Sequence, residues 1–375
     1  MHTRHEVTAV DLDRRELVVR DLQSGEERTD GFDQLVLATG AEAVAPPIPG
    51  ADATEPARTI DAAERFRAAL SRGGESAVVI GGGYIGLEMA EALVQRGLRT
   101  TLIEAAPQVM GTLDADMAAH MQDAAEGVGV RVLTARAVEE VVLGSAGSPC
   151  AVRAGGETIQ ADHVVIATGI RPAVALAEAA GIELGETGAV KVDDHQRCPG
   201  HDGVFAAGDC VESWHRVLDR AVNLQLGTHA NKQGRIAGAN ATGGDLAFPG
   251  VLGTAVSRIC RYEVARTGIS EREAADAGIE VVATTIKDRT RAGYFPGAGP
   301  IWVKLVCEPG SGRLLGGQIV GVEGAAKRID VLATCIWAQM GVEEIELLDL
   351  SYAPPFSGVY DPLLVAARAA AKLLS

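Results

Sequence analysis

The sequence has 375 residues, which is enough for two or three domains that each bury a substantial core. Its 50 acidic and 34 basic side chains give a formal net charge of −16, and no Lys/Arg-rich run offsets this charge. Binding to nucleic acid or to an anionic membrane is therefore disfavoured.

The cysteines and the N-terminal residues point to a cytoplasmic protein. The six cysteines include no C-x-x-C pair, which is typical of a reduced protein. The residues after Met1 lack the apolar core of a signal peptide, and no segment approaches about 18 uninterrupted apolar residues. We therefore expect no membrane partner.

The N-terminal part predicts strands followed by a helix. Residues 6–11 and 16–20 alternate in hydrophobicity, as antiparallel strands do. Residues 34–37 predict a buried strand that ends in the turn Ala38-Thr39-Gly40, and residues 61–71 predict a helix.

The most informative stretch is a strand, a glycine turn and a helix. Residues 77–80 are apolar and mostly β-branched, and Gly81, Gly83 and Gly86 follow with the spacing G-x-G-x-x-G. The first glycine permits a tight turn, the second lets a pyrophosphate approach the backbone, and the third lets the helix pack against its strand. The positive end of the helix at residues 85–96 then faces the phosphates.

The strand predicted at residues 100–103 ends in Glu104. A carboxylate at this position accepts hydrogen bonds from a ribose diol and repels a ribose phosphate, so the sequence favours NADH over NADPH. The alternative is a glycine-rich turn in an ordinary α/β domain, but this does not explain Glu104.

A second Ala-Thr-Gly turn, Ala167-Thr168-Gly169, ends the apolar strand predicted at residues 163–166. Together with Ala38-Thr39-Gly40 it suggests two nucleotide-binding domains of similar build, with the second inserted in the first. Because there is only one glycine fingerprint, the first domain lacks its opening strand, glycine turn and helix. The alternative is a chance repeat of two tripeptides.

The strand predicted at residues 203–207 carries Gly208 and Asp209 to its tip, where an open parallel sheet faces its ligand. Asp209 could bind a polyhydroxylated chain such as ribitol, and the helix at residues 227–240 could point its N-terminus at an electron-rich ring. The alternative is an aspartate in a surface turn.

From residue 248 onward, strands precede helices without βαβ alternation, which predicts a separate α+β domain. The predicted strands cover residues 281–286, 302–307 and 314–322, and the predicted helices cover residues 325–340 and 362–374.

Taken in order, these motifs resemble the pyridine nucleotide-disulfide oxidoreductases over the whole chain, including Asn231-Lys232-Gln233-Gly234-Arg235. The resemblance implies an α/β fold with two Rossmann-like nucleotide-binding domains, the first incomplete and the second inserted in it, plus a C-terminal α+β dimerisation domain. It places an FAD domain at residues 1–72 and 174–247, an NAD domain at 73–173 and the dimerisation domain at 248–375.

Residues 291–297 and 352–356 resemble the branch of CoA-disulfide reductases, NADH oxidases and persulfide reductases. In that branch, tyrosines at the positions of Tyr294 and Tyr352 reach across a homodimer to the redox cysteine and the thiol substrate. The alternative is two packing tyrosines. Lys327 and Arg328 are either contacts for a CoA phosphate or part of a solvated helix face.

The resemblance implies an FAD-dependent NADH oxidoreductase that passes hydride through flavin to CoA-disulfide or a persulfide. The alternatives are an NADH oxidase or peroxidase and, from another class, a non-catalytic NADH-binding or dimerisation module. Tyr84 would gate the flavin, Glu88 would lie near the nicotinamide and the Val7 backbone would meet the FAD adenine. No metal site is predicted, and the cofactor-binding residues are Val7, Thr39, Gly40, Gly81, Gly83, Tyr84, Ile85, Gly86, Glu88, Glu104, Gly169, Gly208, Asp209 and Leu226.

The sequence departs from the family at its beginning. It contains neither an N-terminal glycine unit for FAD nor a Ser-Phe-x-x-Cys segment with the redox cysteine, and Cys210 is a poor substitute. A longer natural protein is the favoured explanation, because the remaining motifs are intact. The alternatives are a true fragment and completion by another chain.

Overall fold

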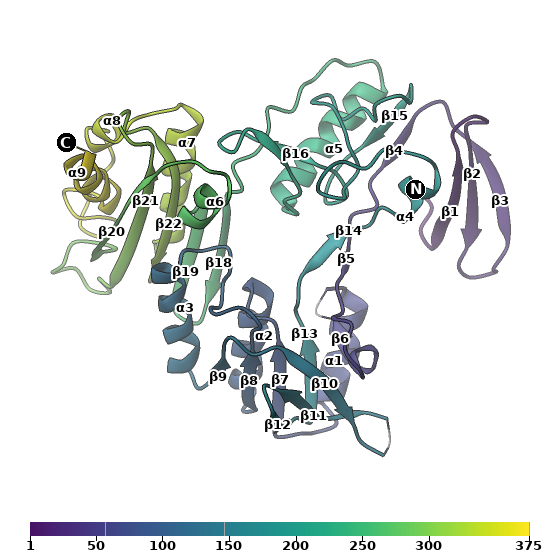
Figure 1. Ribbon diagram of the computed structural model, residues 1–375, viewed down its shortest axis with the longest axis horizontal. Coiled ribbons are helices and arrows are strands. Elements are labelled where there is room, and N and C mark those ends of the chain that lie inside the picture. Colours follow the sequence, from purple (N-terminus) through teal and green to yellow (C-terminus); the bar gives the residue numbers. More distant parts are fainter. Residues whose placement is uncertain (57, 146, 375) are drawn as a thin grey trace. The chain divides into compact units, whose positions relative to one another are not determined.

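The computed structural model describes residues 1–56, 58–145 and 147–374, and its chain forms two compact units. Unit 1 comprises Met1–Glu42 and Ile170–Gly253, and unit 2 comprises Ala43–Gly169 and Thr254–Ser375. Each unit is thus built from two separate segments of the chain (Figure 1). The three-domain division expected from the sequence stays a prediction.

Unit 1 begins with the antiparallel sheet β1 (His5–Asp11), β2 (Glu16–Asp21) and β3 (Glu27–Gly31). The antiparallel pairing of β1 with β2 confirms the sequence prediction. The sequence did not predict β3, because its residues E-R-T-D-G are mostly exposed and carry no apolar alternation.

The α/β part of unit 1 contains a parallel pair, β4 (Leu35–Leu37) and β15 (Val204–Ala206), with Leu37 opposite Ala206. Helix α5 (Gly227–Ala241) lies against both strands. The smaller elements are α4 (Ala175–Ala179), β16 (Ser213–His215) and β17 (Arg220–Val222), and the segments at the unit boundary pair as β5 (Ala41–Ala43) and β14 (Ile170–Pro172).

The first part of unit 2 has a five-stranded parallel sheet in the order β6-β13-β7-β8-β9. Its strands are β6 (Glu55–Pro56), β7 (Ser76–Ile80), β8 (Arg99–Ile103), β9 (Arg131–Leu133) and β13 (His163–Ile166). Its other elements are η1 (Ala51–Ala53), α1 (Ile60–Leu70), α2 (Tyr84–Gln95), α3 (Ala115–Gly127) and a small sheet of β10 (Val138–Leu143), β11 (Pro149–Ala154) and β12 (Glu157–Gln160). The predicted strand, helix and strand around the glycine turn are confirmed.

The second part of unit 2 is a five-stranded antiparallel sheet in the order β18-β19-β22-β21-β20. Its strands are β18 (Ala255–Ile259), β19 (Tyr262–Gly268), β20 (Val282–Arg289), β21 (Pro300–Cys307) and β22 (Leu314–Gly321). Its helices are α6 (Glu271–Asp276), η2 (Ala326–Arg328), α7 (Ile329–Trp337), α8 (Val342–Glu346) and α9 (Pro362–Leu374).

The continuous helix predicted at residues 325–340 is wrong at its start, because α7 begins only at Ile329. The carboxylate of Glu263 accepts the backbone N–H groups of Gly324 and Ala326 at 3.1 and 2.9 Å, which holds this segment in a turn followed by η2.

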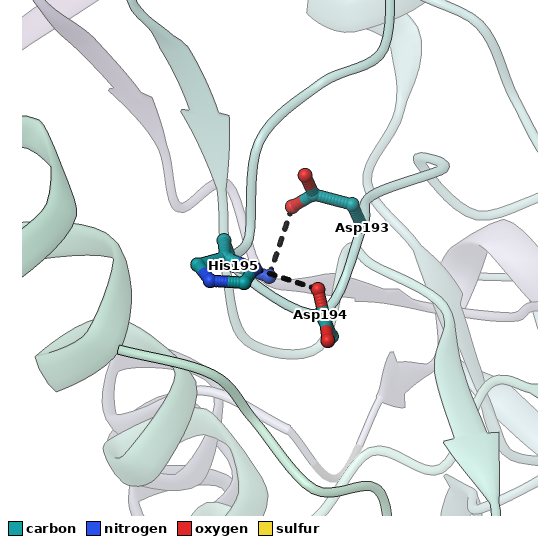
Figure 2. A group of neighbouring side chains, drawn as sticks. All are labelled: Asp193, Asp194 and His195. Carbon is teal, nitrogen blue, oxygen red and sulfur yellow. Dashed lines mark hydrogen bonds and ion pairs between the residues drawn. The ribbon is translucent and has the colours of Figure 1, made fainter. Parts of the chain in front are cut away.

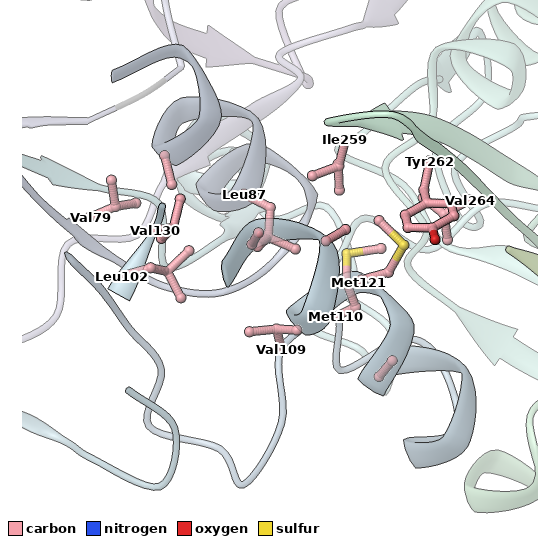
Figure 3. Close-up of a cluster of buried hydrophobic side chains, with 14 of the residues drawn as sticks. Val79, Leu87, Leu102, Val109, Met110, Met121, Val130, Ile259, Tyr262 and Val264 are labelled. Carbon is pink, nitrogen blue, oxygen red and sulfur yellow. The ribbon is translucent and has the colours of Figure 1, made fainter. Parts of the chain in front are cut away.

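One hydrophobic core joins the two parts of unit 2. Leu87 of α2 and Met121 of α3 pack in the same buried cluster as Ile259 of β18 and Val264 of β19 (Figure 3). All four side chains are 1% exposed or less. The helices that cover the parallel sheet therefore share a core with the antiparallel sheet.

A buried lysine joins the same two parts by charge. Lys304 of β21, whose side chain is 5% exposed, forms ion pairs with Asp114 at 3.4 Å, with Asp116 at 2.8 Å and with Glu271. Burial alone would raise the pKa of Asp116, but hydrogen bonds from Lys304 and Thr285 outweigh it and lower this pKa. The ionised carboxylate therefore stabilises the folded state above its unfolded pKa, about 3.9, and this contribution is lost as the pH falls through the folded pKa.

We expect Lys304→Met to lower the free energy of unfolding by about 2 kcal/mol at pH 7, because it leaves three carboxylates without their cation. The loss stays below that of a fully buried pair because Asp116 and Glu271 are about half exposed. In thermal unfolding, the difference from wild type should shrink as the pH falls below about 3.9 and through the folded pKa of Asp116. The control Lys191→Met, which removes an exposed pair with Glu183, should change stability little, and equal losses in both variants would contradict this account.

Candidate functional site

The glycine turn between β7 and α2 has no room for side chains. A Cβ atom on Gly86 would lie 1.9 Å from the carbonyl oxygen of Gly81, and one on Gly81 would lie 2.4 Å from that of Ala167. Gly81 also has φ +107°, which L side chains rarely adopt. These contacts are the close helix-to-strand packing expected from the G-x-G-x-x-G spacing.

A cavity of about 410 Å³ opens at this turn. Gly81, Gly83, Glu104 and Gly169, four of the predicted cofactor-binding residues, all line it. Gly83 is the N-cap of α2 and has no side-chain cap, so the first N–H groups of the helix are available to an anion. A Cβ on Gly83 would meet nothing within 4 Å, which leaves space for a pyrophosphate.

The carboxylate of Glu104 is held by backbone donors. Its Oε2 accepts the Gly82 N–H at 2.6 Å and its Oε1 accepts the Ala106 N–H at 2.8 Å. Each oxygen keeps a second lone pair that can accept a ribose hydroxyl. These acceptor oxygens fit the adenosine half of a dinucleotide with a free ribose diol.

Arg136 also lines this cavity, and the sequence analysis did not identify it. Its Nη1 donates to Glu157 at 2.8 Å, which holds the guanidinium at the cavity wall. Arg136 follows β9 in a turn without any recognisable motif, so no sequence pattern marks it.

Four predicted residues on α2 do not line the cavity, and one of them is Gly86, which packs against Gly81. Tyr84 is partly buried and its hydroxyl lies 3.4 Å from that of Thr112, while burial raises its pKa. Ile85 is 44% exposed. Glu88 accepts a hydrogen bond from the Ser257 hydroxyl, so its carboxylate already has a partner on β18. Their cofactor roles stay predictions.

In unit 1, β4 and β15 bring the other predicted residues together. The Ala207 N–H donates to the Leu37 carbonyl at 3.0 Å, so the turns at Thr39 and at Asp209 leave adjacent strands. Gly208 has φ +90° and its N–H donates to Gln233 of α5 at 3.1 Å. In the turn after β4, Gly40 has φ +71° and follows Thr39. Leu226 is the N-cap of α5, and Val7 lies in β1.

These residues fit one end of FAD. The first turn of α5 has no side-chain cap, so its N–H groups can face an electron-rich ring, and Asp209 lies on the neighbouring strand tip. The FAD pyrophosphate would need a second glycine turn, and no segment of unit 1 carries a G-x-G-x-x-G spacing. The fit is therefore to the flavin and ribityl end.

The two predicted catalytic tyrosines lie together in unit 2. The side chains of Tyr294 and Tyr352 are neighbours, and the interaction with the Tyr352 hydroxyl, with a smaller contribution from burial, raises the pKa of Tyr294. Both rings are exposed, at 77% and 46%. Their loops are joined by a backbone hydrogen bond of 3.2 Å from Ala292 to Pro354.

The buried and partly buried cysteines do not resemble a redox centre, and Cys150 alone of the six is exposed. Burial raises the pKa of Cys198 and of Cys307 to about 12, and the pKa of Cys260 and of Cys335 to about 11. Cys210 is 0% exposed, so it does not present a thiol to a substrate.

Three side chains that could ligate a metal gather in a turn of unit 1 (Figure 2). Asp193 Oδ1 accepts the backbone N–H groups of His195 and Arg197 at 2.9 and 2.8 Å. The His195 ring contacts Asp194 Oδ1 at 2.6 Å and Asp245 Oδ1 at 3.1 Å. These bonds explain the group as a turn stabilised by its own side chains.

Residues 1–234 match the family described as pyridine nucleotide-disulphide oxidoreductase, and residues 254–362 match its dimerisation domain. The chain belongs to the pyridine nucleotide-disulphide oxidoreductases. This match confirms the family resemblance that was inferred from the motifs. It also confirms the predicted architecture, an α/β part followed by a dimerisation domain.

Individual members of the family are also similar over nearly the full chain. The NAD(P)H sulfur oxidoreductase (CoA-dependent) of Pyrococcus furiosus is 37% identical over 98% of this chain and 82% of its own length. An NADH oxidase of Methanocaldococcus jannaschii is 36% identical over 99% of this chain and 83% of its own. The solved structure of an NAD-dependent persulfide reductase from A. fulgidus is 39% identical with a TM-score of 0.94, and the match covers 98% of this chain and 68% of that one.

No helix within the described residues has the length and apolar character needed to cross a membrane.

We expect Glu104→Gln to weaken NADH binding by about 10-fold and to reduce discrimination against NADPH, because the charge that repels a ribose phosphate is removed. Fluorescence titration with both nucleotides measures the two dissociation constants. Glu75→Gln removes an exposed charge that pairs with Arg99 and should leave both unchanged. An unchanged ratio in Glu104→Gln would argue against this role for Glu104.

Proposed function

We propose that this protein is an FAD-dependent oxidoreductase that uses NADH to reduce a thiol-linked acceptor such as CoA-disulfide or a persulfide. For a disulfide, NADH and one proton would convert the S–S bond into two thiols and leave NAD⁺. The observation that carries the proposal is the neighbouring pair Tyr294 and Tyr352, on two loops joined by the Ala292–Pro354 hydrogen bond, in a member of this family. The names of the Pyrococcus and A. fulgidus relatives support the class of acceptor.

NADH would bind at the glycine turn of unit 2. Gly81, Gly83 and the uncapped start of α2 support pyrophosphate binding, and Glu104 supports a ribose diol over a ribose phosphate. Gly86 acts indirectly, since it lets α2 approach β7. The NAD domain would then span residues 73–173.

The FAD domain would comprise residues 1–72 and 174–247, followed by a dimerisation domain at 248–375. Thr39, Gly208 and Asp209 on the adjacent tips of β4 and β15 would position the flavin end. When bound, FAD supplies the two-electron redox centre between NADH and sulfur.

Tyr294 and Tyr352 would act on the sulfur of the acceptor. The raised pKa of Tyr294 keeps its phenol protonated at neutral pH, so the pair can donate a hydrogen bond to a thiolate. Such a bond stabilises a sulfur that leaves a disulfide.

A homodimer with shared active sites would bring these tyrosines to the partner's flavin. The match to the dimerisation domain supports a dimer. Its interface would lie on a segment with exposed apolar side chains, which includes Leu347 at 82%, Phe356 at 74% and Val359 at 70%. The free cysteines support a reducing compartment, and we propose the cytoplasm.

Reduction of oxygen or peroxide is a second candidate, since the Methanocaldococcus relative is named NADH oxidase. The NADH and flavin sites would be the same in both reactions. Oxygen consumption without an added disulfide distinguishes the two.

We expect Tyr294→Phe and Tyr352→Phe each to lower kcat for CoA-disulfide by about 10- to 100-fold, because a hydroxyl that stabilises the departing thiolate is lost. The loss of NADH absorbance measures this rate. With ferricyanide, an acceptor that needs no thiol chemistry, both variants should match wild type. The control Tyr262→Phe removes a phenol outside the pair.

Wild-type rates in both variants would contradict the role of the pair. A colourless protein that binds NADH and oxidises none of it would favour the non-catalytic module instead.

We expect Val359→Asp to raise the dissociation constant of the dimer by at least about 10-fold, because it places a charge in the apolar interface. Sedimentation velocity over a range of concentrations measures this constant. Val256→Asp changes a similarly exposed valine of β18 and should leave the dimer intact, so dissociation in both variants or in neither would count against the proposed interface.

A further inference from the structure

A second cavity, of about 580 Å³, lies in the antiparallel part of unit 2, beside the tyrosine loops. Thr290 and Arg291 line it on one side, and Ser351, Pro355 and Phe356 line it on another. Tyr294 and Tyr352 belong to the same two loops, which the Ala292–Pro354 hydrogen bond joins. The cavity and the tyrosine pair therefore share their supporting backbone.

Arg291 is the unusual residue of this cavity. Its side chain is partly buried, and its Nε is buried with no hydrogen-bond partner. No ion pair or hydrogen bond joins its guanidinium to any residue that the structure describes. Gly297 lies against it, since a Cβ there would be 3.4 Å from Arg291 Nη1.

The other charges deep in the cavity are already compensated. Arg328 Nε donates to Asp361 at 2.9 Å, and its Nη2 donates to the carbonyl oxygens of Thr290 at 2.9 Å and Phe356 at 2.7 Å. The Arg328 guanidinium thus has a structural role, because it holds Asp361 and the two carbonyl groups together. The alternative from the sequence analysis, in which Arg328 is part of a solvated helix face, is wrong. Asp361 also accepts from Ser357 and from the Leu363 N–H.

The charges at the rim are exposed. Lys327 pairs with Asp330, and Glu323 faces solvent, so neither neutralises Arg291. A partly buried guanidinium without an acceptor is costly, and the planar fork of arginine matches a phosphate or carboxylate. An anionic group bound in this cavity would therefore satisfy the guanidinium of Arg291.

We propose that this cavity binds a phosphate group of the thiol substrate, and that Arg291 selects phosphate-bearing thiols over neutral ones. The inference rests on the proposed function, because it takes the acceptor to be a thiol compound. The apolar side chains of Leu350, Pro355 and Phe356 beside Arg291 suit the uncharged arm that links the phosphate to the sulfur. Arg291 binds the substrate at a distance from sulfur and takes no part in the redox step.

Calorimetric titration of the 375-residue protein with coenzyme A and with pantetheine tests this assignment. Pantetheine carries the same thiol arm without phosphates. We expect Arg291→Gln to weaken coenzyme A binding by about 10- to 100-fold and pantetheine binding by less than about twofold. Arg291→Lys keeps the charge without the fork and should fall between wild type and Arg291→Gln.

Two controls separate this effect from others. Arg99→Gln removes an exposed arginine from the parallel part of unit 2 and should leave coenzyme A binding unchanged. Unchanged pantetheine affinity in Arg291→Gln shows that the cavity is still folded. Inorganic phosphate should compete with coenzyme A in wild type, and this competition should disappear in Arg291→Gln.

Unchanged coenzyme A affinity in Arg291→Gln would overturn the proposal, and so would equal losses for both thiols, which indicate a structural role. Phosphate binding that depends on Arg291 without any effect on coenzyme A would also overturn it, since the site would then hold a free anion. Failure of the proposed function would be seen in a separate measurement. In that case the wild-type protein would not use NADH to reduce the disulfide of coenzyme A or that of pantetheine.

Discussion

The close approach of Gly86 to Gly81 is the constraint on which the dinucleotide site depends. With 1.9 Å between a notional Cβ and the Gly81 carbonyl, only glycine lets α2 start directly behind β7. The uncapped N-terminus of α2 then opens on the cavity, and the parallel neighbour β8 delivers Glu104 to the same edge. A larger residue at Gly86 would move the helix away from the phosphates that we propose it binds.

The antiparallel sheet supports this site from the other side of unit 2. Arg266 donates to the Thr112 carbonyl at 2.7 Å and Arg272 donates to that of Gly111, a residue that lines the dinucleotide cavity. Asp114 accepts from Gln318 at 2.6 Å. The segment that follows Glu104 is therefore held by side chains of the dimerisation part, which links nucleotide binding to the integrity of that sheet.

The sequence predicted those parts of the fold that depend on residues close together in the chain. The apolar strand, the glycine spacing and the acid at Glu104 lie within 30 residues, and the structure has all of them in place. The strand β19 escaped prediction although it is buried, because it lacks alternation and a turn signal. Arg136 and the Lys304 network escaped too, since their partners are distant in sequence and no spacing rule connects them.

The missing hydrogen-bond partner of Arg291 could not be predicted from the sequence either. The motif around Tyr294 was visible in the sequence, but the absence of a partner for the neighbouring guanidinium depends on how residues 290–299 and 350–357 fold together. Loops of this kind carry specificity on a rigid scaffold, and their side-chain contacts cannot be deduced from composition.

The most direct test of the central claim is the product stoichiometry under strictly anaerobic conditions. Purified protein is mixed with NADH and an excess of CoA-disulfide, and the NADH consumed and the free thiols formed are both counted. The account predicts two thiols for each NADH oxidised. NADH oxidation without thiol formation, or no oxidation until oxygen is admitted, would contradict it.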